Sequence, residues 1–425
     1  MKHLIQNILL LAILLVPATF TACSNEDTIY TQPTTYTLTV QASKGSDVAT
    51  ARALSLSGTT LNASWAVGEA VTVYNVTKSA DLGGTLSAQT NGSSTTLSGT
   101  LTGSIEVNDE LTLKFLNPAY STQDGTLTGN ATSIDKVCDY ATATVKVTAV
   151  SGGNVTTTAA SFSNQQAIVK FTLKDKADGS TSLSATTLVV TVDGNTYTVN
   201  TSATSEVYVA IPGISDKEVT LTATTASDTY EYKKTGVTFT NGQYYTVNVK
   251  MTRLAKAADL GKVMAQNGCI YDNIASVPSS TTAVGMIAYV GDASNCTHGL
   301  AIALADETGT YTFGTAAGVA TNKNTSLHVV GGTWRIPSKE DWQNMFLACR
   351  KEGDASSADT NMTIAGFKEK ISAVGTGFTN GDTYWTSTDS PSVYGVYFSS
   401  PNQATFQANQ NKMEGSFKAR AVLAF

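Results

Sequence analysis

The chain has 425 residues, a formal net charge of −6 and only 14% charged residues. A mildly acidic chain without a basic cluster is not expected to bind nucleic acid. Its length predicts two to four domains, and its many Thr, Ser, Gly, Val and Tyr residues favour strands over helices.

The first 22 residues have the layout of a secretory signal. Lys2 gives a short basic start, an apolar run follows, and small residues lead into Cys23. The run is shorter than the about 20 apolar residues of a membrane-spanning helix. Small residues directly before a cysteine resemble the cleavage site of bacterial lipoproteins, in which the peptidase cuts before the cysteine and the thiol carries lipid. We therefore expect a signal peptide over 1–22 and a lipid on Cys23; the alternative is an ordinary signal peptide with a chance cysteine.

Residues 24–27, Ser-Asn-Glu-Asp, place two acids directly after that cysteine. In surface-exposed lipoproteins of gut and oral anaerobes, an acidic stretch at this place resembles an export signal to the outer face of the outer membrane. The resemblance implies a surface-exposed protein, held at the cell outer membrane by its lipid anchor. A solvated polar linker is the alternative.

Short stretches of alternating polar and apolar residues occupy the chain up to about residue 253. Residues 36–40 alternate with a period of two, as a half-buried strand does. Many such stretches, separated by Gly, Asn and Ser turns, indicate β-sandwiches or barrels. The sequences Asp-Gly-Asn at 193–195 and Asn-Gly at 241–242 are typical of hairpin turns.

The chain after residue 254 differs, because it holds three of the tryptophans and the two segments with clear helical spacing. Residues 338–341, Ser-Lys-Glu-Asp, match a capping box, and apolar residues follow at helical spacing up to position 349. Apolar residues over 364–374 predict a second helix. We expect an α+β domain over 254–425.

Three segments resemble the fimbrillin-type (type V) pilins of gut and oral anaerobes: 61–75, 164–171 and 241–247. The resemblance covers roughly 36–252 and implies a mostly β protein with two tandem β-sandwich, transthyretin-like lobes. It places these lobes at 53–158 and 159–253, after a lipidated linker and a removable first strand at 23–52.

Residues 254–425, which we call the tail, are similar to a different family, the C-type-lectin-like, formylglycine-enzyme-like (major paralogous) domains of bacterial surface proteins. The segments that carry the likeness are 288–303, 332–342, 384–388 and 420–423. The resemblance implies a C-type-lectin-like α+β domain over 254–425, which is a scaffold for binding rather than a known ligand.

Arg52 is the residue for which the sequence makes the most specific functional prediction, a site of proteolytic cleavage. It stands in a loop-like stretch between two predicted strands, and exposed loops are preferred sites of proteolysis. In fimbrillins, cleavage at an arginine here removes the first strand, and a neighbouring subunit's strand fills the groove. The resemblance therefore implies processing between Arg52 and Ala53, with a trypsin-like protease and other pilin subunits as partners. A plain surface arginine in a linker is the alternative.

The tail sets the position that such a subunit would take. Its last strand-like segment, Ala419–Phe425, is most simply a core strand of the tail itself. Such a subunit can accept a strand but not donate one, so we expect a fimbrial tip or minor pilin that displays an adhesive domain. The alternatives are a surface-binding lipoprotein that does not polymerise and, less favoured, an enzyme that uses the tail.

The chemistry of the tail predicts binding rather than catalysis, with no catalytic residue, cofactor or metal site. Trp334 and Trp385 could stack on sugar rings, although such residues more often lie in a core. The ligand class is a host or bacterial surface glycan or protein. Cys269 and Cys296 form the closest candidate disulfide by sequence, and free buried cysteines are equally plausible.

Overall fold

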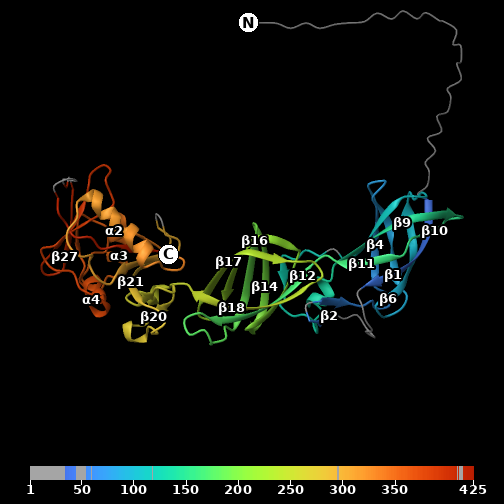
Figure 1. The fold of residues 1–425 in the computed structure, drawn as a ribbon, viewed down its shortest axis with the longest axis horizontal. Coiled ribbons are helices and arrows are strands. Elements are labelled where there is room, and N and C mark those ends of the chain that lie inside the picture. The colour runs from blue at the N-terminus through green and yellow to red at the C-terminus, as the bar shows by residue number, and fades with distance from the viewer. Residues whose placement is uncertain are drawn as a thin grey trace, which may run out of the picture.

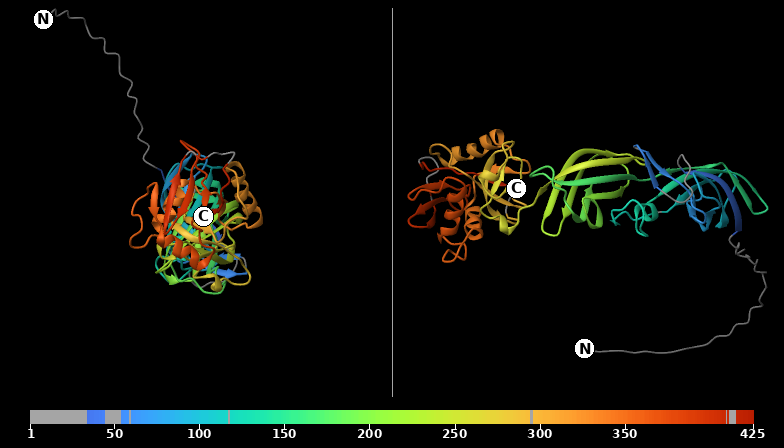
Figure 2. Two further views of the ribbon diagram at one scale, coloured as in Figure 1. Left: turned by 90° about the vertical axis from the view of Figure 1, so that its left-hand side faces the viewer. Right: turned by 90° about the horizontal axis from the view of Figure 1, so that it is seen from below.

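The computed structural model describes residues 34–44, 54–58, 60–116, 118–293, 296–408, 410 and 415–425. The predicted signal peptide, Cys23, the acidic stretch 24–27, Arg52 and Ala53 all lie outside the described residues. The protein is mostly β, as predicted, and its parts form a row of two β lobes and a terminal domain with helices (Figure 1). The view from below shows the same row, and the end-on view superposes the three bodies, so the molecule is elongated (Figure 2).

The first lobe is one eight-stranded sheet in the order β10-β1-β11-β9-β7-β4-β5-β6. Its strands are β1 (Thr34–Lys44), β4 (Ala70–Asn75), β5 (Ala80–Ala88), β6 (Ser94–Gly103), β7 (Glu110–Phe115), β9 (Ala141–Ser151), β10 (Asn154–Thr157) and β11 (Ala160–Asn164). Since β1 also pairs with β6, the sheet closes on itself. The lobe predicted as a sandwich is therefore closed like a barrel, and closure removes its free edges.

The second lobe holds a sheet in the order β15-β12-β18-β17-β16-β13-β14-β8. Its strands are β8 (Thr122–Gln123), β12 (Ala167–Asp175), β13 (Ala185–Val192), β14 (Asn195–Thr204), β15 (Glu206–Ile211), β16 (Ile214–Thr224), β17 (Thr229–Phe239) and β18 (Tyr244–Arg253). Strands β17 and β18 pair only at Tyr230 and Glu231, so the sheet is nearly split into two halves there.

Both predicted hairpin turns join consecutive strands that pair antiparallel. Asp193 and Gly194 both have positive φ, 50° and 79°, and join the paired strands β13 and β14, as a tight hairpin requires. The predicted turn at 241–242 joins β17 and β18, which pair antiparallel at Tyr230–Arg253 and Glu231–Thr252, the register that a turn centred on these two residues produces. This hairpin is open near its turn, because β18 pairs in parallel with β12 from Tyr244 onward and meets β17 only at the far end.

The predicted boundary between the lobes at 158/159 is also wrong. The run from Ser163 to Phe171 suggests one strand, but Gln165 and Gln166 interrupt it. Before them, β11 pairs with β1 and β9 of the first lobe, and after them, β12 pairs with β15 and β18 of the second. The lobes also interleave, because β8 joins the second lobe beside β14 although it precedes β9 in sequence.

A short hairpin of β2 (Leu54–Ser57) and β3 (Thr60–Ala63) lies where the lobes meet. Ala63 packs there with Ile168 and Ala210 of the second lobe and with Ile134 of the short helix α1 (Ile134–Val137). The two lobes are thus joined by an apolar cluster as well as by the chain.

The terminal domain has a six-stranded sheet in the order β20-β19-β21-β22-β28-β23 and a four-stranded sheet in the order β24-β27-β26-β25. The first holds β19 (Val263–Ala265), β20 (Ile270–Tyr271), β21 (Ala283–Val290), β22 (Gly299–Ala303), β23 (Thr333–Arg335) and β28 (Val422–Ala424). The second holds β24 (Asn361–Thr363), β25 (Thr383–Trp385), β26 (Gly395–Ser399) and β27 (Gln403–Gln407). The helices are α2 (Phe313–Ser326), α3 (Lys339–Ala348) and α4 (Ala365–Val374), with one-turn 3₁₀ helices η1 (Ala257–Asp259) and η2 (Ile274–Ser276).

The predicted capping box at the start of α3 is confirmed. The Ser338 hydroxyl accepts a hydrogen bond from the Asp341 backbone N–H at 3.0 Å, and the Asp341 carboxylate accepts one from the Ser338 N–H at 2.6 Å. The same carboxylate forms an ion pair with Arg335. The helix then buries Trp342, whose ring contacts five other aromatic rings, those of Phe346, Phe367, Phe378, Tyr384 and Phe398.

Candidate functional site

The first strand, β1, is the element that closes the first lobe. Along one side it pairs antiparallel with β6 from Thr34 to Ser43. Along its other side it pairs in parallel with β10 at Thr37 and Leu38 and with β11 from Ala42 to Lys44. Without β1, β6 and the β10–β11 edge would face an open slot with unpaired backbone groups on both sides.

The sequence of β1 explains why it fits this slot. Its odd-numbered positions, mostly Thr, are exposed, whereas Tyr36, Leu38, Val40 and Ala42 are buried in the core of the lobe. Full burial of a side chain such as Leu38 or Val40 contributes about 1.5–3 kcal/mol. The period-two pattern seen in the sequence is therefore the pattern of a strand with one core face, and its register is fixed because a slip of one residue would expose that face.

A buried ion pair holds the end of β1. Lys44 continues the series of even-numbered, core-facing positions of β1, and its side chain is only 1% exposed. Its Nζ lies 2.6 Å from Oδ2 of Asp139, which is 2% exposed and lies between α1 and β9. The same Nζ lies 3.6 Å from the Phe115 ring centroid and 5.1 Å from that of Trp65. Oδ1 of Asp139 has no hydrogen-bond partner among the described residues, so Lys44 is the principal group that compensates this buried carboxylate.

Sequence reasoning missed Lys44 and Asp139. The signal for Lys44 was present, because a lysine stands at the inward phase of an alternating strand, directly after four inward apolar residues. A buried lysine needs a partner. That partner could not be found from the pattern, since Asp139 is distant in sequence and comes to β1 only through the closure of the sheet.

The predicted cleavage site lies between the end of β1 and the start of β2, outside the described residues. β1 ends at Lys44 in the core of the first lobe, and β2 begins at Leu54 where the lobes meet. Arg52 and Ala53 lie between these two anchored points, outside the described residues. The prediction that Arg52 is cut therefore stays a prediction, and so does the lipid on Cys23.

Trp334 and Trp385, for which the sequence left open ligand stacking and, more often, a core position, both lie in the core. They are 2% and 0% exposed. Trp334 donates its indole N–H to the Leu327 carbonyl at 2.9 Å, and Trp385 donates to the Tyr311 carbonyl at 2.5 Å. Both rings are core residues with their polar atom satisfied, which is the other role that the sequence left open.

Of the two possibilities left open for Cys269 and Cys296, a disulfide or free buried thiols, the structure has the second. Both residues are free thiols, and they belong to different apolar clusters. Burial raises the pKa of Cys269 to about 11 and that of Cys349 to about 12. Thiols of this kind are poor nucleophiles, so none of them supports cysteine chemistry in the terminal domain.

Among the described residues, no helix is long and apolar enough to cross a membrane. No protein-family model matches the sequence, and no curated protein does.

Solved structures do show likenesses. A fimbrial protein from Bacteroides ovatus is 12% identical, with a TM-score of 0.32, over 93% of this chain and 100% of that protein. A putative cell adhesion protein from the same species is 14% identical, with a TM-score of 0.30, over 53% and 96%. A fimbrial assembly protein from Parabacteroides distasonis is 16% identical, with a TM-score of 0.25, over 50% and 90%. The chain is structurally similar to fimbrial and putative cell adhesion proteins.

Proposed function

We propose that this protein is a fimbrial tip or minor pilin subunit whose first lobe accepts a strand from a neighbouring subunit in place of β1. The single observation that carries the proposal is the position of β1. It is paired on both sides and supplies part of the core, yet only the segment that contains Arg52 connects it to the rest of the lobe. One cut in that segment makes β1 a separate peptide, held by non-covalent contacts alone.

The slot that β1 would leave has the features of a strand-accepting site. It offers two edges of backbone donors and acceptors and a row of apolar sites where Tyr36, Leu38, Val40 and Ala42 now lie. Main-chain hydrogen bonds supply affinity in such a site, and alternate side-chain pockets supply specificity. In this proposal the lipid on Cys23 brings the protein to the outer membrane and leaves with the first strand after cleavage.

The position at a tip is supported by the last strand. β28 lies between β22 and β23 in the larger sheet of the terminal domain. Removing it to serve a neighbour would split that sheet, so the subunit is suited to accept a strand and not to give one. The terminal domain, whose C-type-lectin-like character is part of the proposal, would then point outward as the adhesive end.

N-terminal sequencing of the assembled protein tests the proposal. Material purified from the cell surface should begin at Ala53. Arg52→Gln should remain uncut and unassembled, while Arg52→Lys, which keeps a basic side chain for a trypsin-like protease, should be processed and assembled. Assembled material that begins only at Cys23 would contradict the proposal.

A further inference from the structure

A cleft of about 520 Å³ lies where the second lobe meets the terminal domain, far from β1. Its volume is in the usual range for sites that bind small molecules. Strands β17 and β18 of the second lobe form one wall. Strands β19 and β20, the loop after α2 and the residue Phe425 form the opposite wall.

Contacts on several sides hold the two walls in place. Arg253 at the end of β18 donates two hydrogen bonds to Asp259 of η1, at 2.7 and 3.0 Å. On another side, the Tyr271 hydroxyl donates to the backbone carbonyl of Ala177 at 3.2 Å. A third contact joins Nε2 of His298 and Oε2 of Glu231, 3.6 Å apart. Because these contacts cross from the lobe to the domain, the cleft is a built cavity and not a gap between separate bodies.

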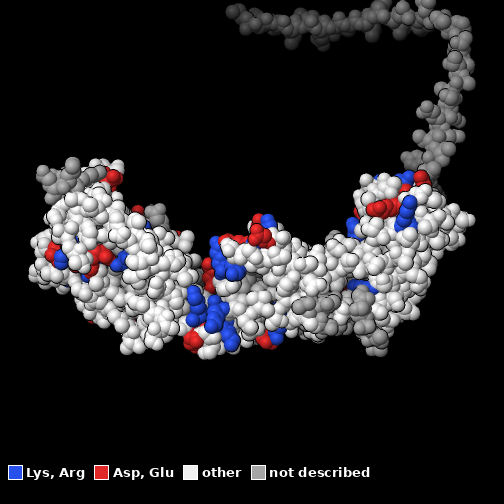
Figure 3. Space-filling model, in the orientation of Figure 1, with Lys and Arg blue, Asp and Glu red and all other residues white. Residues whose placement is uncertain are grey.

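The wall on the second lobe is basic. Figure 3 shows basic side chains gathered at the end of the second lobe that adjoins the terminal domain. Lys176, Lys234 and Lys250 line the cleft, and none of the three has an ion-pair partner among the described residues. Lys233 also lines it, but its Nζ lies 2.9 Å from a Glu218 carboxylate oxygen. Glu231 also lines the cleft, where it lies beside His298, so the lining lysines outnumber the acid and the wall is positive within a chain of net charge −6.

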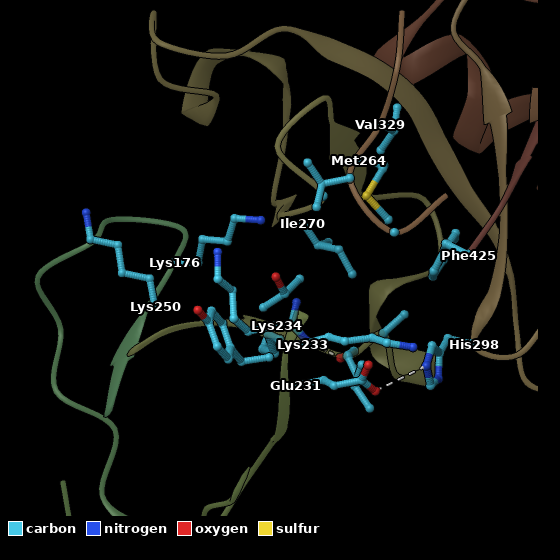
Figure 4. A pocket seen from close by; sticks show the side chains of 18 of the residues that line it. Lys176, Glu231, Lys233, Lys234, Lys250, Met264, Ile270, His298, Val329 and Phe425 are labelled. Atoms are coloured by element: carbon cyan, nitrogen blue, oxygen red, sulfur yellow. Dashed lines mark hydrogen bonds and ion pairs between the residues drawn. The ribbon is translucent and has the colours of Figure 1, made fainter. Parts of the chain in front are cut away.

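The wall on the terminal domain is apolar. Met264, Ile270, Val329 and Phe425 lie on that side, opposite the lysines (Figure 4). Val330 adds an apolar side chain that is 57% exposed. The apolar wall of the terminal domain faces the lysines of the second lobe. Such a cleft is complementary to a ligand that has an anionic group at one end and a hydrophobic body at the other.

We propose that this cleft binds a small organic anion with an apolar body, such as a carboxylate, sulfate or sulfonate on a hydrocarbon or aromatic frame. The anionic group lies against Lys176 and Lys234, and the body lies against Ile270, Val330 and Phe425. This site is independent of strand exchange in the first lobe. Because its ligand touches both walls, binding also stabilises the junction between lobe and domain.

A matched pair of fluorescent probes tests the proposal with the full mature chain. 1-Anilinonaphthalene-8-sulfonate carries the anionic group, and N-phenyl-1-naphthylamine is the same frame without it. We expect one sulfonate probe per chain, with a dissociation constant on the order of tens of micromolar for a ligand of this size. The neutral probe should bind about tenfold more weakly, and raising the salt concentration should weaken only the sulfonate.

Substitutions in each wall separate the two parts of the site. The double variant Lys176→Glu with Lys234→Glu should weaken the sulfonate at least about tenfold and leave the neutral probe within about twofold. Val330→Asp, at an exposed position that does not build the core, should weaken both probes. Lys146→Glu, an exposed change in β9 of the first lobe, is the matched control and should alter neither. The proposal would be overturned by any of three results. These are the absence of saturable sulfonate binding, equal affinity of the parent chain for the two probes, and a double variant that binds the sulfonate as tightly as the parent chain does.

Discussion

Replacing Lys44 by Met tests whether the buried ion pair holds β1 in its slot. Methionine keeps the apolar stem beside Trp65 and Phe115 but removes the charge, so Asp139 stays buried without its cation. Breaking a buried pair in this way costs about 3–5 kcal/mol. Solvent cannot moderate the loss, because the two side chains are 1% and 2% exposed.

Hydrogen exchange at the β6 amides that face β1 is the appropriate measurement, because it reports on the first lobe alone. A loss of 3–5 kcal/mol corresponds to exchange faster by about one hundredfold to several thousandfold. The amides of α3 in the terminal domain should be unchanged. Lys78→Met is the matched control, since the side chains of the Lys78–Glu106 pair in the same lobe are 31% and 67% exposed and solvent screens their attraction.

A double variant completes the test. Lys44→Met with Asp139→Asn removes both charges and should recover much of the lost protection, because no uncompensated carboxylate then remains. If Lys44→Met alone changes β6 exchange by less than about fivefold, the ion pair does not hold the strand, and the reasoning is refuted.

Three further outcomes concern the terminal domain and the thiols. Trp342→Ala removes a fully buried ring and should lower the unfolding free energy of the terminal domain by about 3–5 kcal/mol; a calorimetric transition that does not move would contradict this. Asp341→Ala removes the acceptor for the Ser338 N–H in the capping box of α3 and the ion-pair partner of Arg335, and should lower the unfolding free energy by about 2–4 kcal/mol in the same measurement. Asp341→Asn keeps an acceptor oxygen and should cost less. Burial raises the pKa of Cys138 and of Cys349 to about 12, while unfolded thiols ionise near pH ~8.5. Both thiols should therefore resist alkylation in the native chain, and their contribution to stability should be complete below pH ~8.5 and decline as the pH rises toward 12; rapid native alkylation at pH ~8.5 would refute this.

Local patterns in the sequence predicted the local features well. The alternation around Leu38, the turn at 193–195 and the capping box at Ser338 each depend on neighbours within a few residues, and all three are present. Helix α2 was not predicted, because Gly, Thr and Asn are poor helix formers and only Ala316, Val319 and Ala320 of it are buried. Its stability comes from packing, which the sequence does not display.

Features that depend on distant pairings could not be read from the sequence. The closure of the first lobe joins β1 to β6 and to β10, and the Lys44–Asp139 pair follows from that closure. The cleft likewise arises from lysines of the second lobe and apolar residues of the terminal domain, brought together by the arrangement of two bodies. The burial of Trp385 could not be predicted either, since the sequence around a tryptophan does not distinguish one that binds sugar from one that fills a core.

Titration of a peptide with the sequence of residues 34–44 into a chain that begins at Ala53 tests the central claim most directly. If β1 is a replaceable strand, the peptide binds one to one and restores protection from exchange to the β6 amides. A peptide with glutamate at the Lys44 position should bind far more weakly, because it faces Asp139. A shortened chain whose β6 is already protected without peptide, or one that binds no peptide, would contradict the claim that the first lobe accepts a strand.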